Sequence, residues 1–294
     1  MSGIACAKLI LFGEHSAVSG YPAIGLPLPL MMKVTLSSSE SAIGELIPHL
    51  TRLIPELQQD SPYRLEIQSE IPTGVGLGSS SALCVATVRA AYEYIGEEIE
   101  PKKLWKIAHE IEKQYHGKPS GIDTGISAYE SLVYFEKKEE ELPSHKILER
   151  ASLHLVIGAL PRANNTEELI EQVQSHERKQ EIFEALGNLT MNAVEKINDP
   201  GFIGECANEA QALLSQFALS TPELDQILKF GNSCGAFGGK LSGAGGGGAY
   251  FLVAGNQEHA EEIARALSNH IIDQKIPSAL RPMPFQFQRK AALR

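Results

Sequence analysis

The stretch IPTGVGLGSSSAL, residues 71–83, carries the strongest signal in the sequence. Three alternating glycines lead into three serines, and the serines open the segment 79–95, whose apolar residues predict a helix buried on most sides. Glycine lets a backbone approach a ligand closely, and the first turn of a helix attracts phosphate. A glycine turn with a serine N-cap is the simpler alternative, but a cap needs fewer of these residues. We therefore predict a phosphate-binding loop made by Gly74, Gly76, Gly78, Ser79, Ser80 and Ser81.

A second glycine cluster, KLSGAGGGGAYFLV, lies at residues 240–253. Its spacing fits GxGxxG, but a dinucleotide-binding fingerprint needs a helix after it, whereas 249–253 reads as a strand. A Walker loop is excluded too, because the two Gly-Lys pairs are followed by Pro119 and Leu241 instead of Ser or Thr. Five glycines in six positions are costly in a strand, so we expect this backbone to approach something closely.

Composition places the chain among soluble globular proteins. It has 294 residues, with 26 Lys and Arg against 36 Asp and Glu, so its formal net charge is −10. Its length suggests about two domains, and its acidity argues against binding to nucleic acid or an anionic membrane. We expect no secretory leader and no membrane span, because no apolar stretch reaches ~20 residues. The four cysteines form no CxxC pair, so we expect reduced thiols in a cytoplasmic protein.

In the first half of the chain, strands alternate with helices. Segments 4–12 and 63–69 read as strands, and a second helix begins at Pro101. Lys8 lies inside the otherwise apolar first strand. Because burying an unpaired charge is costly, Lys8 needs a partner, and we take it as a candidate functional residue.

A charged run at 136–146 reads as a solvated loop, and we place the domain boundary after it, giving domains 1–150 and 151–294. Leaving aside helices across 178–233, the second half has the order βαββαβ, which is the order of a ferredoxin-like unit. The expected elements are strand 153–157, helix 166–175, a strand near 239–242, strand 249–254, helix 258–269 and strand 284–288.

Three segments together resemble one enzyme superfamily. PTGVGLGSSSA (72–82) resembles the P-x-x-x-G-L-G-S-S-A motif of the galactokinase, homoserine kinase, mevalonate kinase and phosphomevalonate kinase (GHMP) superfamily. AKLILFGEHSAVSGYPAI (7–24) resembles its N-terminal motif, and KLSGAGGGGA (240–249) its C-terminal glycine motif. The G-E-H form of the first motif and HGKPSGIDTGIS (116–127) are similar to the mevalonate kinase family within it. The resemblance implies an α+β fold, with an S5-like N-terminal domain and a ferredoxin-like C-terminal domain.

The resemblance also implies an activity, namely ATP-dependent phosphorylation of the primary hydroxyl of mevalonate in isoprenoid precursor synthesis. It implies catalytic roles for Lys8 and Asp123, and Mg²⁺ ligation by Ser80 and Glu112. It implies substrate contacts for Glu14, His15 and Thr166. The nucleotide would lie against the phosphate loop, including Leu77, and near the C-terminal glycine motif, represented by Gly243, Ala244, Gly245 and Gly246. A homodimer is compatible with the resemblance.

One segment departs from the mevalonate kinase pattern. Those kinases carry a segment like D-T-G-x-x-x-S-T-K/R, whereas residues 157–170 here read IGALPRANNTEELI. Thr166 is the best match, Glu167 follows where a basic residue is common, and Arg162 is a candidate for the missing positive charge. Ser81 also replaces a usual alanine. Another GHMP kinase, acting on phosphomevalonate, a sugar or an amino alcohol, therefore stays open, and so does a non-catalytic ATP-binding protein.

Overall fold

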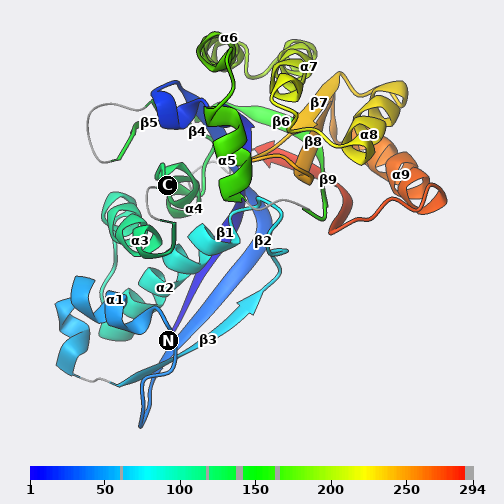
Figure 1. Cartoon of the computed structure of the whole chain (residues 1–294). Helices are drawn as coiled ribbons and strands as arrows, with labels where there is room; N and C mark the ends of the chain where they lie inside the picture. The colour runs from blue at the N-terminus through cyan, green and yellow to red at the C-terminus, as the bar shows by residue number, and fades with distance from the viewer. Residues whose placement is uncertain (60–61, 117–118, 137–141, 163–165, 289–294) are drawn as a thin grey trace.

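The computed structural model describes residues 1–59, 62–116, 119–136, 142–162 and 166–288. Within these ranges the chain forms two antiparallel sheets, each with helices packed against it (Figure 1). No helix of the described ranges is long and apolar enough to cross a membrane.

The first sheet is built from the N-terminal half of the chain. Its described strands are β1 (Ser2–Phe12), β2 (Ala23–Ser38), β3 (Tyr63–Ser69), β4 (Val133–Glu136) and β5 (Ser144–Ile147). The order is β1-β2-β4-β5, and β3 pairs with the later part of β2. The long β2 therefore holds this sheet together.

Helices cover one side of this sheet (Figure 1). They are α1 (Ile47–Leu53), α2 (Ser79–Ile95), α3 (Pro101–His116) and α4 (Ile122–Tyr129), with the short 3₁₀ turns η1 (Ala17–Ser19) and η2 (Pro55–Gln59). α2 packs on β1 and β2, and α3 and α4 pack in turn on α2. The bounds of α2 agree with the prediction, and its buried residues lie on most sides of the helix, as a central helix requires.

β2 is not among the predicted strands, because Pro27 and Pro29 interrupt it. Proline cannot donate a backbone hydrogen bond, so it normally marks an edge or a break. In the structure, Pro27 pairs with Lys8 of β1, and a register shift follows between Cys6 and Ala7. The two prolines lie between the stretches of β2 that pair with β4 and β3, so the missing donors do not interrupt either pairing.

The second sheet has the predicted ferredoxin-like order. Its described strands are β6 (Ser152–Leu160), β7 (Gly238–Leu241), β8 (Gly248–Ala254) and β9 (Leu280–Gln288), arranged β7-β8-β6-β9. The helices of this half are α5 (Thr166–Gln174), α6 (Lys179–Glu195), α7 (Pro200–Gln216), α8 (Pro222–Ser233) and α9 (Gln257–Asp273). α7, α8 and α9 pack on the sheet, and α6 packs on α7.

The charged run at 136–146 is not simply a loop. β4 ends at Glu136, and β5 begins at Ser144 and pairs with β4, so strand residues enter the run from both ends. Its middle, residues 137–141, lies outside the described residues. The domain boundary between 150 and 151 stays a prediction, and it falls between β5 of the first sheet and β6 of the second.

Candidate active site

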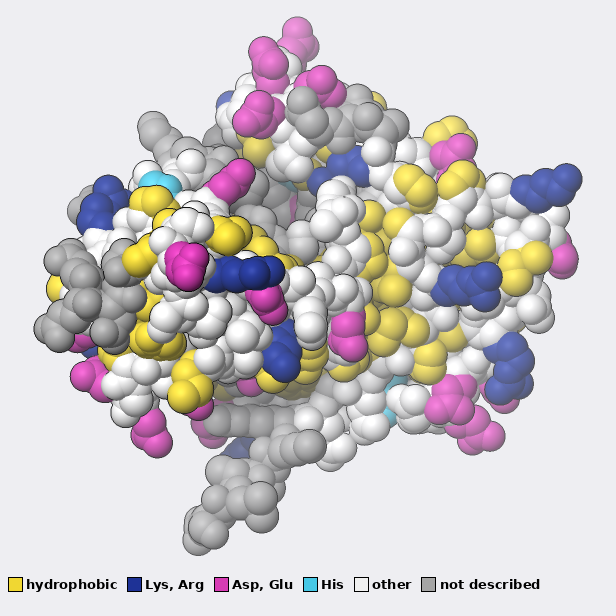
Figure 2. All heavy atoms as spheres, turned by 90° about the horizontal axis from the view of Figure 1, so that it is seen from below, with side chains coloured by type: hydrophobic (Ala, Val, Ile, Leu, Met, Phe, Trp, Pro, Cys, Tyr) yellow, Lys and Arg dark blue, Asp and Glu magenta, His cyan; other side chains and the backbone are white. Residues whose placement is uncertain are grey.

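A cleft of about 620 Å³ gathers most of the predicted site residues. Its wall is formed by β1 and the turn after it, the glycine loop, the first turn of α2, and parts of α3, α4 and α5. Gly243 and Ala244 of the second glycine cluster complete the lining. Segments that are far apart in the sequence thus meet at one place. On the face shown in Figure 2, acidic and basic side chains of the described residues are mixed.

The glycine loop needs glycine for steric reasons. Gly76 and Gly78 have φ of 84° and 75°, in the left-handed region that other residues avoid. A Cβ on Gly78 would lie 2.6 Å from the side chain of Lys8, and one on Gly76 would lie 2.7 Å from Nη2 of Arg162. The backbone therefore comes close to two cationic side chains, and α2 begins directly after it. Ser79, Ser80 and Ser81 all line the cleft.

The two glycine segments are tied to each other and to β1. The Ala249 N–H donates to the Val75 carbonyl at 2.8 Å. The Ser242 hydroxyl bonds to both backbone groups of Ile10, at 2.9 Å to the oxygen and 3.0 Å to the nitrogen. The Lys8 N–H donates to the Leu77 carbonyl at 3.0 Å. These bonds hold the backbone of the cleft wall in place, and none of them uses a side chain that lines the cleft.

Three predicted nucleotide contacts are not among the described residues that line the cleft. The Leu77 side chain is buried in the core of the first domain, because its neighbours on both sides turn their backbone toward the cleft. Gly245 and Gly246 turn away toward Leu219, whose carbonyl accepts from the Gly246 N–H at 2.8 Å. Glycine at position 245 therefore lets the segment around Leu219 pack closely against the backbone of the C-terminal glycine motif.

Lys8 and Asp123 form the ion pair that the sequence analysis expected for Lys8. Their Nζ and Oδ2 atoms are 2.9 Å apart, and the side chains are 5% and 36% exposed. The lysine is therefore buried, while the carboxylate opens into the cleft that both residues line. Asp123 lies in the first turn of α4, and the Ser127 hydroxyl anchors this helix to the Cys6 carbonyl of β1 at 2.9 Å.

Glu14 has a partner that the sequence analysis did not foresee. Lys240 of β7 donates to the Glu14 carboxylate and, at 2.7 Å, to the Leu241 carbonyl. The side chains of both charged residues are almost wholly buried. Burial raises the pKa of Glu14 and lowers that of Lys240, whereas their mutual attraction opposes both shifts. The other carboxylate oxygen of Glu14, Oε2, is buried without a partner in the described part of the chain.

His15 links the turn after β1 to the second glycine cluster. It has φ of 59°, and its Nε2 lies 3.0 Å from the Ala244 carbonyl oxygen. A carbonyl only accepts, so this nitrogen carries the proton, and Nδ1 is left as an acceptor. Burial lowers the pKa of His15 to about 4, so the ring is neutral at pH 7.

Glu112 lies behind the start of α2. The Ser81 hydroxyl donates to its Oε1, and its Oε2 is buried with no partner among the described residues. Nδ1 of His109 is 3.9 Å from this oxygen, which is too far for a hydrogen bond. No group of three His, Cys, Asp or Glu that could hold a metal occurs in the described ranges. A cation at Glu112 would therefore need further oxygens, from a serine hydroxyl, water or a bound phosphate.

Arg162, the candidate for the missing positive charge, and Thr166 contact each other in the cleft. Nη1 of Arg162 donates to the Thr166 hydroxyl at 3.1 Å. Nε and Nη2 of the same guanidinium are buried and lack partners in the described chain. Nη2 lies against the backbone of Gly76 and Gly248, so the group points at both glycine segments. Burial lowers the pKa of Arg162, but arginine keeps its charge in proteins.

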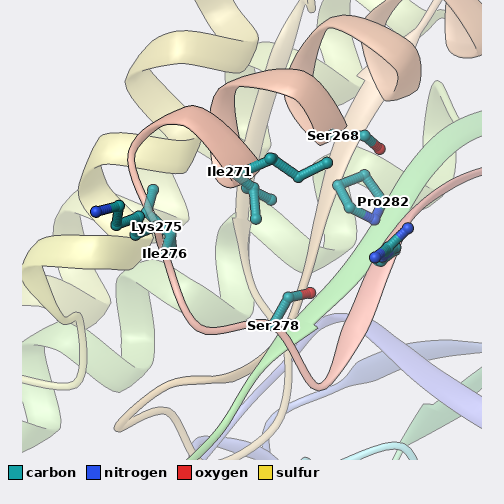
Figure 3. Close-up of a pocket in the computed structure, with 8 residues that line it drawn as sticks. Ser268, Ile271, Lys275, Ile276, Ser278 and Pro282 are labelled. Atoms are coloured by element: carbon teal, nitrogen blue, oxygen red, sulfur yellow. The ribbon is translucent and has the colours of Figure 1, made fainter.

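A smaller hollow of about 270 Å³ lies between the end of α9 and the start of β9 (Figure 3). Ser268, Ile271, Lys275 and Pro282 are among its lining residues. None of the predicted site residues contributes to it, so it does not compete with the cleft as the candidate active site.

Comparison with known proteins assigns both halves of the chain to one class. The family model for the GHMP kinases N terminal domain matches residues 45–131, and that for the GHMP kinases C terminal domain matches residues 190–273. The first match contains the glycine loop, and the second contains β7 and β8 of the second sheet.

Individual relatives show which GHMP kinases the chain resembles. The chain is 31% identical to the mevalonate kinase of Methanothermobacter thermautotrophicus, over 92% of this chain and 94% of the relative. It is 30% identical to that of Thermococcus sibiricus, over 89% and 90%. The crystal structure of L. major mevalonate kinase in complex with R-mevalonate superposes with a TM-score of 0.82, at 23% identity over 99% and 97% of the two chains. The chain belongs to the mevalonate kinase family of GHMP kinases.

Proposed function

We propose that the protein transfers the γ-phosphoryl group of ATP to the primary hydroxyl of mevalonate and releases 5-phosphomevalonate and ADP. The Lys8–Asp123 ion pair carries this proposal, because it opens into the same cleft as the glycine loop. Relatives described as mevalonate kinases, which align with about nine-tenths of the chain, support the acceptor. They do not favour a different GHMP substrate.

The nucleotide phosphates would lie against the glycine loop and the first turn of α2. Backbone N–H groups at a helix start attract phosphate, and the absence of a Cβ at Gly76 and Gly78 lets the phosphate approach the loop closely. Arg162 supports this position, because its two unpartnered nitrogens face Gly76 and Gly248. A guanidinium with free N–H groups matches phosphate oxygens in pairs.

The cleft also fits a divalent cation beside the phosphates. A buried carboxylate oxygen without a donor is costly, and Glu112 Oε2 is such an atom. We propose that Glu112 and Ser80 hold Mg²⁺, which keeps most of its coordination sites for phosphate oxygens and water. When bound, the ion neutralises charge on the transferring phosphate.

At the acceptor hydroxyl, Asp123 takes the proton as the oxygen attacks the γ-phosphorus. The bond from the γ-phosphorus to the bridging oxygen breaks, and the electron pair leaves with ADP. Lys8 stabilises the negative charge that develops on the attacking oxygen. We propose that His15, through Nδ1, and Glu14 and Thr166, which line the same cleft, orient the acceptor.

A coupled ADP-release assay tests the proposal on four acceptors: mevalonate, phosphomevalonate, galactose and homoserine. We expect turnover with mevalonate alone. Turnover confined to another acceptor would refute the substrate and leave the kinase chemistry standing, and no turnover with any of them would refute the activity itself.

We further propose that the enzyme works in the cytoplasm with reduced thiols. All four cysteines are free in the structure, and three of them are buried. Burial raises the pKa of Cys6 to about 12, which keeps this thiol protonated and unreactive.

A further inference from the structure

The bond between Ser81 and Glu112 makes the two oxygens of this carboxylate unequal. Ser81 lies in the first turn of α2 and is 2% exposed, and Glu112 lies on α3, which packs against α2. The serine hydroxyl donates to Oε1. Oε2 has no donor among the described residues, although the carboxylate lines the cleft.

A carboxylate can bind a metal through one oxygen or through both. Ca²⁺ accepts bidentate carboxylates and six to eight ligands in flexible geometry, whereas Mg²⁺ demands a near-octahedral shell and keeps several waters. An oxygen that already accepts a hydrogen bond from a buried hydroxyl is a poorer metal ligand. The environment of Glu112 therefore favours coordination through one oxygen, Oε2.

We propose that Ser81 is a positioning residue, which engages Oε1 of Glu112 and thereby makes the carboxylate a one-oxygen ligand that favours Mg²⁺ over Ca²⁺. This inference rests on the proposed function, in which a divalent cation binds at Glu112. Ser81 takes the place of an alanine that is usual in the GHMP motif, and an alanine there has no hydroxyl that could engage Oε1.

The test measures ADP binding by calorimetry with the full-length protein in three buffers, containing saturating Mg²⁺, saturating Ca²⁺ or EDTA. The ratio of the Kd for ADP in EDTA to the Kd for ADP in each metal reports how much that metal strengthens ADP binding. For Ser81→Ala we expect the Mg²⁺ ratio to fall about tenfold, as for other residues that orient a metal ligand. The Ca²⁺ ratio should stay or rise, since the freed Oε1 permits bidentate binding. Because each ratio is taken against the same variant's Kd in EDTA, a change in metal-free ADP binding cancels.

Thr87→Val is the matched control. Thr87 is buried in the same helix and its hydroxyl has no partner among the described residues, so removing the hydroxyl should leave all three Kd values unchanged. A loss of ADP affinity in Ser81→Ala that is equal with and without metal, so that both ratios stay parental, would indicate a changed phosphate loop and overturn the positioning role.

Glu112→Gln separates this inference from the proposed function. If this variant loses the metal effect while Ser81→Ala keeps both parental ratios, the inference is wrong and the metal position stands. If Glu112→Gln keeps the parental ratios, the proposed metal position is wrong, and the role of Ser81 is refuted with it.

Discussion

The ammonium of Lys240 and the carboxylate of Glu14 form an ion pair that solvent does not reach, between residues 226 positions apart in the sequence. Glu14 follows β1 of the first sheet, and Lys240 belongs to β7 of the second. The rings of Phe12 and Phe251 lie near the ammonium, with centroids 5.9 and 5.5 Å from Nζ. The pair therefore joins the two halves of the protein at the floor of the cleft.

Lys240→Met should destabilise the protein strongly, because it leaves the Glu14 carboxylate buried without a cation. Removing one partner of such a pair costs about 3–5 kcal/mol. The double variant Glu14→Gln/Lys240→Met carries no buried charge and should be more stable than Lys240→Met alone. Urea denaturation measures the free energies of unfolding.

Lys113→Met provides the control for this comparison. Lys113 pairs with Glu110 on the surface of α3, so its loss should change the free energy of unfolding far less. A double variant as unstable as Lys240→Met would show that the unpaired carboxylate is not the cause.

Asp123→Asn should lower kcat about 10²–10⁴-fold, because the amide no longer accepts the hydroxyl proton. The variant keeps the size of the side chain, so the Kd for ATP should stay within a few-fold of the parent. Steady-state kinetics and ATP calorimetry give the two values. Asp199→Asn is the matched control, since Asp199 caps α7 away from the cleft and asparagine caps a helix equally well. Undiminished turnover in Asp123→Asn would remove this residue from the mechanism.

Much of the fold could be predicted because its signals are local. Gly78 and Gly96, both in the left-handed region, bound α2, so its bounds could be read from the sequence. β2 could not be predicted, since Pro27 and Pro29 disfavour a strand unless its neighbours are known. Its pairing with β1 on one side and with two short partners on the other decides whether the prolines are tolerated, and only the fold supplies that information.

The site, too, has residues that the sequence predicted and contacts that only the structure shows. Motifs identified the glycine loop and the Lys8–Asp123 pair, whereas the partners of Glu14 and Glu112 came only from the structure. Lys240 could have been found by the reasoning applied to Lys8, because it too is a lysine within a predicted strand, although its neighbours there are glycines and one leucine. No comparable signal linked Ser81 to Glu112, since the packing of α2 on α3 brings them together.

Arg162→Met should reduce phosphoryl transfer, because it removes the buried guanidinium that faces both glycine segments. Loss of one group that stabilises transition-state charge typically lowers kcat about 10²–10³-fold. Arg162→Lys should recover only part of the lost kcat, because an ammonium cannot bind phosphate in the bidentate manner. Steady-state kinetics with ATP and mevalonate measure the effect.

Arg178→Met serves as the control, because Arg178 pairs with Glu181 on the exposed surface of α6. Parental kcat in Arg162→Met would show that the guanidinium does not contact the transferring group.

His15 should make the stability of the protein depend on pH below neutrality. Its pKa is about 4 in the folded protein and near 6.5 in an unfolded chain. Between these values the unfolded chain binds a proton that the folded protein does not, so its contribution is complete above pH 6.5 and is lost as the pH falls. The loss amounts to ~2 kcal/mol between pH 7.5 and pH 5. Urea denaturation at both pH values measures it.

His15→Gln isolates this effect from the other titrating groups. The glutamine amide can still donate to the Ala244 carbonyl but does not titrate, so the variant should lose less stability than the parent between pH 7.5 and pH 5. Equal losses in the two proteins would mean that His15 is free to take up a proton in the folded state. The proton would then enter at Nδ1, and the bond from Nε2–H to the Ala244 carbonyl would hold the turn after β1 against the second glycine cluster in both protonation states.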